Sequence, residues 1–251
     1  MDWQLRGKTA VVTGASQGIG RTLARMLAME GVQVIGAARR VELVEAMAVE
    51  VQASCGERIH AVAVDLYQPD AAARLAAAAL EQLGRVDILM NVAGASRPLK
   101  FDAGSDEWEE GMLLNFTRVR ELTHSLVPQM RQRGWGRVVN FTGTSEPRML
   151  NAAFTAKAAV HVWAKGLSRE VAADGVTVNS LQPGRIHSEQ MTKRYPTLAL
   201  EQAYAQAEIP VARFGEPEEI AAVAMFLASP LASYVTGTVI PVDGGSSRFA
   251  F

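Results

Sequence analysis

The sequence predicts an α/β fold, a single doubly wound domain built around a seven-stranded, mainly parallel sheet. Seven short apolar runs rich in β-branched residues alternate with segments of helical periodicity. The runs are almost continuously apolar, which is typical of parallel strands that helices cover on both faces. No Gly/Ser/Pro-rich linker and no internal repeat divides the 251 residues. We therefore expect one domain that spans residues 1–251.

The expected strands follow one another at the spacing of βα units. In chain order they are Thr9–Val12, Val32–Ala37, His60–Val64, Val86–Val92, Arg137–Phe141, Val176–Leu181 and Val239–Val242. The expected helix ends are marked by Gly31, Gly84 and Gly175, and the expected first turns of helices by Pro69 and Pro217. The alanine-rich segment Ala71–Leu83 keeps its leucines at helical spacing, so we expect a packed helix there.

The first strand runs into a glycine turn, Thr13–Gly20, before the apolar-periodic stretch Leu23–Leu27. Glycine permits a tight turn, lets a phosphate approach at Gly18, and lets the helix pack closely at Gly20. Such a turn aims free backbone N–H groups and the positive end of a helix dipole at one point. The pattern predicts a Rossmann-type dinucleotide site, the alternative being an ordinary βα turn. The expected contacts are Gly14, Ser16, Gln17, Gly18, Ile19 and Gly20.

The second strand ends in Ala38-Arg39-Arg40, where a dinucleotide site usually places an acidic residue that binds the ribose hydroxyls. The acidic residue is absent. The Arg39 guanidinium can instead hold a 2′-phosphate through two charge-assisted hydrogen bonds. The sequence therefore favours NADP(H) over NAD(H). The alternative is a pair of solvated arginines that open a helix, and Gln17 stands where a second basic residue would strengthen the NADP(H) assignment.

Other candidate ligand contacts follow the ends of later strands, where open α/β sheets bind ligands. They are Asp65, Leu66, Asn91, Ala93 and Gly94. Further motifs are Asn115, Lys157, Pro183-Gly184, the segment Arg213–Ile220, Gly237 and Asp243-Gly244-Gly245. Taken together with the glycine turn, these motifs resemble the short-chain dehydrogenase/reductase family from one end of the chain to the other.

The resemblance implies an NADP(H)-dependent oxidoreductase of the carbonyl reductase or alcohol dehydrogenase type, with 3-oxoacyl reduction as one form. It implies that Lys157 holds the nicotinamide ribose and that Asn115 holds a helix kink and a water. It adds Pro183, Gly184 and Ile186 to the cofactor contacts. The family uses an asparagine, a serine, a tyrosine and a lysine to manage the proton, while the nicotinamide carries the hydride.

This chain departs from that tetrad. Ala153 stands four residues before Lys157, where the family has its tyrosine, and Gly143 stands at the serine position. Thr144 or Ser145 is the expected substitute for the serine. For the missing phenol the candidates are a water held by Asn115 and Lys157, a hydroxyl of Thr144 or Ser145, His187, or Tyr195. His124 and His161 are expected in packing or capping roles, because histidines on helix faces are more often structural than chemical.

Residues 187–214 interrupt the alternation of strands and helices, with a weak amphipathic helix around Leu200–Ala207, and we expect them to form a lid over the substrate.

Activity through a nonstandard proton donor is the leading hypothesis. The alternatives are a cofactor-binding pseudoenzyme that serves a partner protein and a non-redox reaction on the same scaffold.

Composition limits the partners. The formal net charge is −1 and the 25 basic residues are scattered, so we expect a small carbonyl or alcohol substrate and neither nucleic acid nor membrane as partner. No metal site is expected. The one cysteine and the absence of a signal pattern favour the cytoplasm. We expect a homo-oligomer, a tetramer or dimer, with Phe249 and Phe251 either in an interface or folded back on their own subunit.

Overall fold

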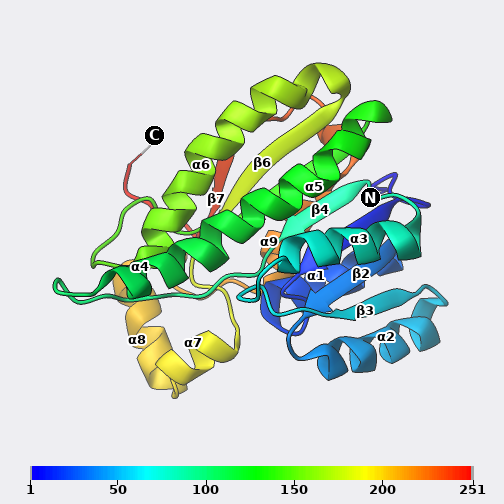
Figure 1. The fold of residues 1–251 in the computed structure, drawn as a ribbon. Coiled ribbons are helices and arrows are strands. Elements are labelled where there is room, and N and C mark those ends of the chain that lie inside the picture. Colours follow the sequence, from blue (N-terminus) through cyan, green and yellow to red (C-terminus); the bar gives the residue numbers. More distant parts are fainter. Residues whose placement is uncertain (1, 250–251) are drawn as a thin grey trace.

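The computed structural model describes residues 2–249, and within them seven strands form one parallel sheet (Figure 1). The strands are β1 Thr9–Thr13, β2 Gln33–Ala38, β3 Ile59–Ala63, β4 Ile88–Asn91, β5 Gly136–Phe141, β6 Val176–Pro183 and β7 Val239–Val242. Their order across the sheet is β3-β2-β1-β4-β5-β6-β7, and every pairing is parallel. Both the number and the direction of the predicted strands are confirmed, with ends displaced by one or two residues.

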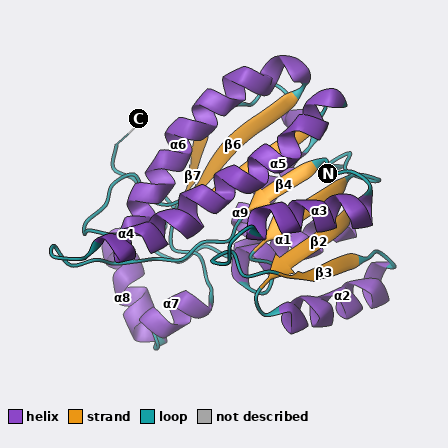
Figure 2. Ribbon diagram, in the orientation of Figure 1, coloured by secondary structure: helices purple, strands orange, loops and turns teal. Residues whose placement is uncertain are grey.

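Helices occupy the connections (Figure 2). They are α1 Gly18–Met29, α2 Val41–Cys55, α3 Ala71–Leu83, α4 Ser105–Met112, α5 Arg118–Gln132, α6 Ala152–Val171, α7 Glu189–Arg194, α8 Leu198–Glu208 and α9 Pro217–Ala228. Short helical segments are η1 Leu113–Thr117, η2 Ala172–Asp174 and η3 Pro230–Ala232. No helix among the described residues is long and apolar enough to cross a membrane.

Two apolar layers sandwich the sheet. One packs α1, α2 and α9 against one face, and the other packs α3, α5 and α6 against the opposite face. The central strand β1 is buried along its whole length, with Val11 paired to Ile35 on one side and to Leu89 on the other. Side chains that are covered on both faces have to be apolar on both faces, which explains the near-continuous apolar runs.

The order in which strands are added to the sheet changes direction at β1 and β4, although all the strands remain parallel. The chain runs outward from β1 to β3, returns to β4 beside β1, and then continues outward to β7. Loops after β1 and β4 therefore diverge at the carboxyl edge, and a crevice at such a switch point is where open α/β sheets bind ligands. The helices α7 and α8 (yellow to amber) lie outside both helix layers (Figure 1).

Most of the helix starts and ends predicted from glycine and proline are confirmed. Gly84 ends α3 in the left-handed conformation, with φ +72°, and Pro217 is the first residue of α9. The expected helix Ala71–Leu83 has the predicted bounds. The placement of Pro69 in a first turn is wrong, because Asp70 adopts φ +55° and the helix begins only at Ala71.

Candidate active site

The glycine turn lies against the end of β4. The Thr13 hydroxyl accepts hydrogen bonds from the backbone N–H groups of Val92 and Ala93, each at 3.0 Å. Gly14 has φ +71°, and a Cβ there would lie 3.1 Å from the Ala93 backbone. A Cβ at Gly20 would lie 2.3 Å from the Gly14 carbonyl oxygen, so α1 packs against the turn as closely as predicted. Only glycine fits at this second position.

The helix α1 presents its N-terminus at this turn. Gln17 is its N-cap residue and makes no side-chain cap hydrogen bond, so the first-turn N–H groups are free to bind an anion. Gly18 has φ +51°, and the only heavy atom near its missing Cβ is Cβ of Ser188, at 3.6 Å. Ile19 turns inward and packs against the core. Ser16, partly buried, lies within the turn that precedes the helix.

Two arginines follow β2, and they differ in their contacts. Arg40 donates to the Gln17 side chain and to both carboxylate oxygens of Glu189 in α7, at 3.3 Å. Arg39 is exposed and is near enough to Tyr67 for its charge to favour the ionised phenol. Arg40 is therefore a basic group beside the turn that the sequence did not single out. The sequence could have indicated Arg40 through its position next to Arg39. Its contact with Gln17 could not be predicted, because that contact depends on the tertiary fold.

The residues predicted at the ends of β3 and β4 divide into two groups. Asp65 accepts from the Tyr67 N–H at 3.1 Å, and Leu66 is buried, so both stay beside the carboxyl edge. The Asn91 amide instead donates to Asn140, at 2.9 Å, and to Thr123, at 3.1 Å, in the interior. Its side chain is occupied by contacts within the protein.

Asn115 lies in the π-helical segment η1, between α4 and α5. Its amide nitrogen donates to the carbonyl oxygens of Gly111, at 2.9 Å, and Ala95, at 3.2 Å, and its oxygen accepts from the Ala95 N–H at 3.2 Å. The side chain thus fixes the irregular turn of the helix to the loop after β4. A π-helical turn inside an α-helix is frequently found at functional sites.

The start of α6 is fixed by Asn151. Its side-chain oxygen accepts from the N–H groups of Ala153, at 2.9 Å, and Arg97, at 3.1 Å, and its amide donates to Ser96. This N-cap joins α6 to the loop after β4. Lys157 consequently stands between the ends of β4 and β5.

Lys157 and Asn115 converge on Gly94. A Cβ at Gly94 would lie 2.9 Å from Oδ1 of Asn115 and 3.4 Å from Nζ of Lys157, so only glycine leaves both polar atoms accessible. The Lys157 ammonium donates to the Thr142 carbonyl oxygen at 3.2 Å. Burial lowers the pKa of Lys157 to about 8. The lysine therefore gives up its proton more readily than a solvent-exposed lysine does.

Beside Lys157, the structure places an aromatic ring that the sequence did not single out. A Cβ at Gly143 would lie 3.3 Å from Cδ of Lys157 and 3.8 Å from Cδ1 of Phe154. Phe154 therefore borders Gly143, which the sequence analysis predicted at the serine position, and the signal for it was an aromatic residue one helical turn before Lys157. Ala153 is buried, with its methyl group 3% exposed.

The hydroxyl groups after β5 already have partners. Thr144 accepts from the Glu146 N–H at 3.0 Å, and Ser145 donates to the Gln182 side chain at 3.4 Å. At 3.4 Å the bond of Ser145 is longer than the usual range for a hydroxyl donor, so this hydroxyl is the less firmly held of the two.

The predicted lid contains α7 and α8, packed on their own aromatic cluster. Tyr195 lies with its ring 5.0 Å from Tyr204 and 5.3 Å from Phe214 between centroids. His187 is held by two carboxylates, with Nε2 2.9 Å from Glu201 and Nδ1 2.9 Å from Glu216. Neither residue has a hydrogen bond to Lys157 or Asn115 within residues 2–249.

The segment that precedes the lid is anchored in the sheet. Pro183 ends β6, and the Gly184 N–H donates to the Val242 carbonyl oxygen at 2.9 Å. A Cβ at Gly184 would lie 2.6 Å from Cα of Asp243. Ile186 is buried and pairs with Gly215. This segment therefore leaves the carboxyl edge of the sheet beside the last strand.

The histidines of helices α5 and α6 have packing contacts. His161 lies 2.7 Å from the Thr142 hydroxyl, and burial lowers the pKa of its imidazole. His124 accepts from the Trp163 indole N–H at 3.3 Å. These contacts agree with the structural roles expected from the sequence.

Comparison with known proteins decides the family. Residues 14–247 match the family model described as Enoyl-(Acyl carrier protein) reductase, and the 3-oxoacyl-[acyl-carrier-protein] reductase FabG of Vibrio cholerae is 38% identical over 247 residues, 96% of this chain and 98% of that protein. The chain belongs to the short-chain dehydrogenase/reductase family. As a member of this family it is an NAD(P)-dependent oxidoreductase.

Two solved family members share the whole fold. L-sorbose reductase from Gluconobacter frateurii, complexed with NADPH and L-sorbose, has a TM-score of 0.94 at 30% identity, covering 99% of this chain and 100% of its own. A 7α-hydroxysteroid dehydrogenase complexed with NADH and a 7-oxo bile acid has a TM-score of 0.91 at 29% identity, covering 100% and 98%. One structure holds NADPH and the other NADH, so the family fold accommodates both coenzymes.

Proposed function

We propose that the chain is an NADP(H)-dependent reductase of a small ketone or 3-oxoacyl thioester, with a proton supply that does not involve a tyrosine. The observation that carries the proposal is the convergence of Asn115 and Lys157 on Gly94 at the carboxyl edge. The named relatives reduce carbonyl groups, an oxoacyl thioester in one case and a sugar in another, and this supports the reductase class.

The residues present fit a dinucleotide. The cradle formed by Gly14, Gly18 and Gly20 leaves space that a Cβ would fill, next to the free N–H groups of α1. Arg39 would hold the 2′-phosphate, and Lys157 would hold the nicotinamide ribose. When bound, the nicotinamide supplies or accepts the hydride.

The proton reaches the substrate oxygen, in this proposal, from the Lys157 ammonium through a water that Asn115 also binds. Oδ1 of Asn115 and Nζ of Lys157 both lie close to Gly94, and a water beside this glycine would bind to both groups. The pKa of about 8 favours the exchange, because a general acid works best near the pH of the reaction. The Asn115 oxygen has a second lone pair beyond the one that faces Ala95.

The other predicted donors have weaker support. His187 is tied to Glu201 and Glu216, and Tyr195 packs in the aromatic cluster of the lid. The Thr144 hydroxyl accepts from the Glu146 N–H, which leaves its own proton free to donate, and the Ser145 hydroxyl donates to Gln182 in a long bond. These two hydroxyls remain the alternatives.

A second candidate function has a specific observation in its favour. Ala153 supplies only a buried methyl group at the position where the family has a phenol. Loss of general-acid help costs about 10²- to 10⁴-fold in rate, which is enough to silence an enzyme. A pseudoenzyme that binds the coenzyme without consuming it, or a non-redox reaction on the same scaffold, would be consistent with this loss.

The lid assignment rests on contacts between residues 187–214 and the coenzyme cradle. Cβ of Ser188 lies 3.6 Å from the point where a Gly18 Cβ would be, and Glu189 binds Arg40. We propose that these residues cover the bound substrate and coenzyme. In the same proposal the single domain comprises residues 1–251.

The test measures NADPH oxidation with a panel of ketones and 3-oxoacyl thioesters. Lys157→Met should lower both coenzyme affinity and turnover. Lys165→Met is the matched control, because this exposed lysine lies on the same helix and donates only to Gly237. Failure of the whole panel together with normal coenzyme binding would favour the pseudoenzyme, and failure of coenzyme binding would overturn both readings.

A further inference from the structure

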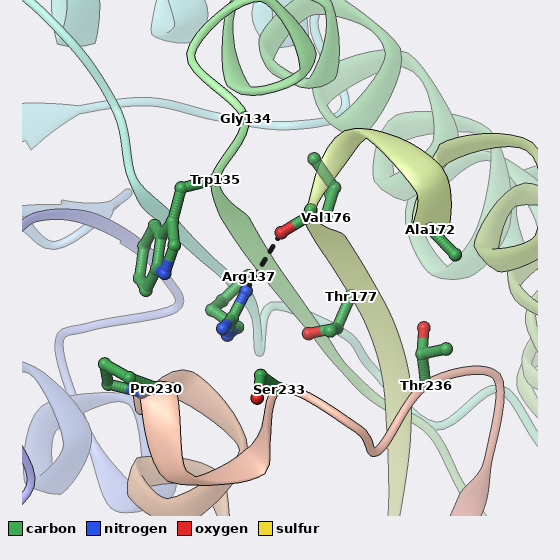
Figure 3. Close-up of a pocket in the computed structure, with 10 residues that line it drawn as sticks. Gly134, Trp135, Arg137, Ala172, Val176, Thr177, Pro230, Ser233 and Thr236 are labelled. Atoms are coloured by element: carbon green, nitrogen blue, oxygen red, sulfur yellow. Dashed lines mark hydrogen bonds between the residues drawn. The ribbon is translucent and has the colours of Figure 1, made fainter.

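A cavity of about 270 Å³ lies at the amino-terminal edge of the sheet, opposite the candidate active site (Figure 3). Its walls come from the starts of β5 and β6, the chain after α6, and the loop around η3. From Arg137 in this cavity to Thr142 beside Lys157 is five residues of extended chain, which is about 16 Å. The cavity is therefore separate from the proposed coenzyme site.

The cavity contains an arginine with no acidic partner. Arg137 is a charged residue in a buried strand, and only 2% of it is exposed. No carboxylate within residues 2–249 forms an ion pair with it. None of the residues that line the cavity is acidic. The guanidinium lies 4.4 Å from the centroid of Trp135. A buried cation without a counterion is costly, so its retention calls for a partner.

Backbone oxygens satisfy part of the guanidinium. Nε donates to the carbonyl oxygen of Ser229 at 3.3 Å, and Nη1 donates to those of Gly136, at 2.9 Å, and Gly175, at 3.2 Å. Nη2 donates to no protein atom among the described residues. Burial lowers the pKa of Arg137 only to about 10, so the group is still cationic at neutral pH.

A second group in the cavity also lacks a partner. Thr177 is the register neighbour of Arg137 on β6, and its hydroxyl is buried without a hydrogen bond to any described residue. Figure 3 shows this hydroxyl directed toward the Arg137 guanidinium. Leaving a buried hydroxyl unsatisfied costs folding free energy, as an unpaired cation does. The buried Thr177 hydroxyl therefore lies beside the guanidinium at the wall of the cavity, and an anion bound to Nη2 would form a hydrogen bond with it after a rotation of the threonine side chain.

We propose that this cavity binds a tetrahedral oxyanion of the phosphate class, as free phosphate or as a phosphomonoester. The free Nη2 of Arg137 and the Thr177 hydroxyl would both donate to its oxygens. Guanidinium groups are well suited to phosphate because they offer several N–H donors in a fixed plane. The anion would neutralise the buried charge and thereby stabilise the folded protein.

The experiment titrates the full chain with inorganic phosphate and with glycerol phosphate, and follows the melting temperature and the tryptophan fluorescence, to which Trp135 contributes with three other tryptophans. The decisive variant is Thr177→Val, which keeps the shape of the side chain and removes the hydroxyl. We expect saturable binding in the millimolar range or tighter, and about tenfold weaker binding by Thr177→Val, the effect of one hydrogen bond to a charged group. Without anion, Thr177→Val should melt at the same or a higher temperature.

Two controls locate the binding. Arg58→Met removes an exposed positive charge elsewhere and should leave phosphate binding unchanged. Arg39→Met removes the proposed 2′-phosphate ligand and should leave the Thr177-dependent part of the binding unchanged. Tighter binding of glycerol phosphate than of phosphate would identify a monoester as the ligand, and the reverse would identify free phosphate. The proposal would be overturned if the Arg39→Met variant no longer bound phosphate while the Thr177→Val variant still did. It would also be overturned if binding did not saturate at millimolar anion.

Discussion

The Lys157 ammonium donates to the carbonyl oxygen of Thr142 at 3.2 Å, which joins the first turns of α6 to the end of β5. The bond places a titratable nitrogen at the carboxyl edge of the sheet, and no carboxylate within residues 2–249 forms an ion pair with it. Burial alone accounts for its lowered pKa. A lysine with a lowered pKa is suited to the proton-donor role proposed above.

Carbonyl reduction should slow as pH rises through about 8, because the proposal requires the protonated form of Lys157. Alcohol oxidation needs the neutral amine and should therefore accelerate over the same interval. The measurement is the pH dependence of kcat in each direction with saturating coenzyme. A reductive profile that is flat between pH 7 and pH 9 would assign the proton to a different group.

A phenol placed beside Lys157 should increase reductase activity. Phe154→Tyr adds one hydroxyl to a ring that already borders Gly143, and we expect kcat to rise about tenfold to a hundredfold. Ala153→Tyr has to fit a ring at a buried position, so we expect it to lower the free energy of unfolding by about 1–3 kcal/mol.

The matched control for the phenol is Phe101→Tyr, which makes the same change at a ring that is 98% exposed. Steady-state kinetics and thermal melting of the three variants check both expectations. If only Ala153→Tyr increases the rate, the productive position for a phenol is residue 153, four residues before Lys157 as in the family. That result would exclude Phe154 from the site.

The sequence predicted the sheet well, because burial on both faces requires a strong, local apolar signal. The seven strands and the bounds of α3 followed from that signal and from glycine at the helix ends. It did not predict that Asn115 lies in a π-helical turn, since this conformation depends on bonds to the Ala95 backbone, which is remote in sequence. It also missed the contact of Arg40 with Gln17 and the cavity around Arg137, because both arise only when separate strands are brought together.

Arg39 and Arg40 should have separable effects on coenzyme choice. Arg39→Ala should weaken NADPH binding about tenfold or more and leave NADH binding unchanged, because a charge-assisted contact to the 2′-phosphate is lost. Arg40→Ala should affect both coenzymes alike, since Arg40 contacts Gln17 and Glu189. Dissociation constants from fluorescence titration check this. Loss of the NADPH preference in Arg40→Ala alone would transfer the phosphate contact to Arg40.

We expect the chain to form a homo-oligomer through the outer face of α6. Val162 is 78% exposed there, next to Trp163, whose ring contacts Phe116 at 6.2 Å between centroids. Val162→Glu should shift the assembly toward smaller species, because burying an unpaired carboxylate in an interface is costly. Sedimentation velocity measures the shift. Val49→Glu, on the exposed face of α2, is the control, and a monomeric parent would contradict the expectation. Phe249 is 74% exposed and so does not pack on its own subunit, whereas Phe251 lies outside the described residues.

The contacts of His187 with Glu201 and Glu216, called the His187 clamp below, should make the proposed lid more stable in mild acid. Burial tends to lower the pKa of His187, but its hydrogen bonds to Glu201 and Glu216 outweigh burial and raise the pKa above its ordinary value of 6.5. A histidine with a raised folded-state pKa contributes stability that is complete below the unfolded pKa and is lost as pH rises through the folded one. Because the side chain is 38% exposed, we expect at most about 1 kcal/mol.

The variant His187→Gln isolates this contribution, because the exposed His124 and the half-buried His161 titrate equally in both proteins and cancel in the difference. The wild-type advantage in melting temperature should be largest near pH 6 and should shrink toward pH 8. His60→Gln, at a histidine without an ion pair among the described residues, should show no such trend. A difference between wild type and His187→Gln that stays constant with pH would mean that the imidazole is neutral in the clamp and acts only through its hydrogen bonds.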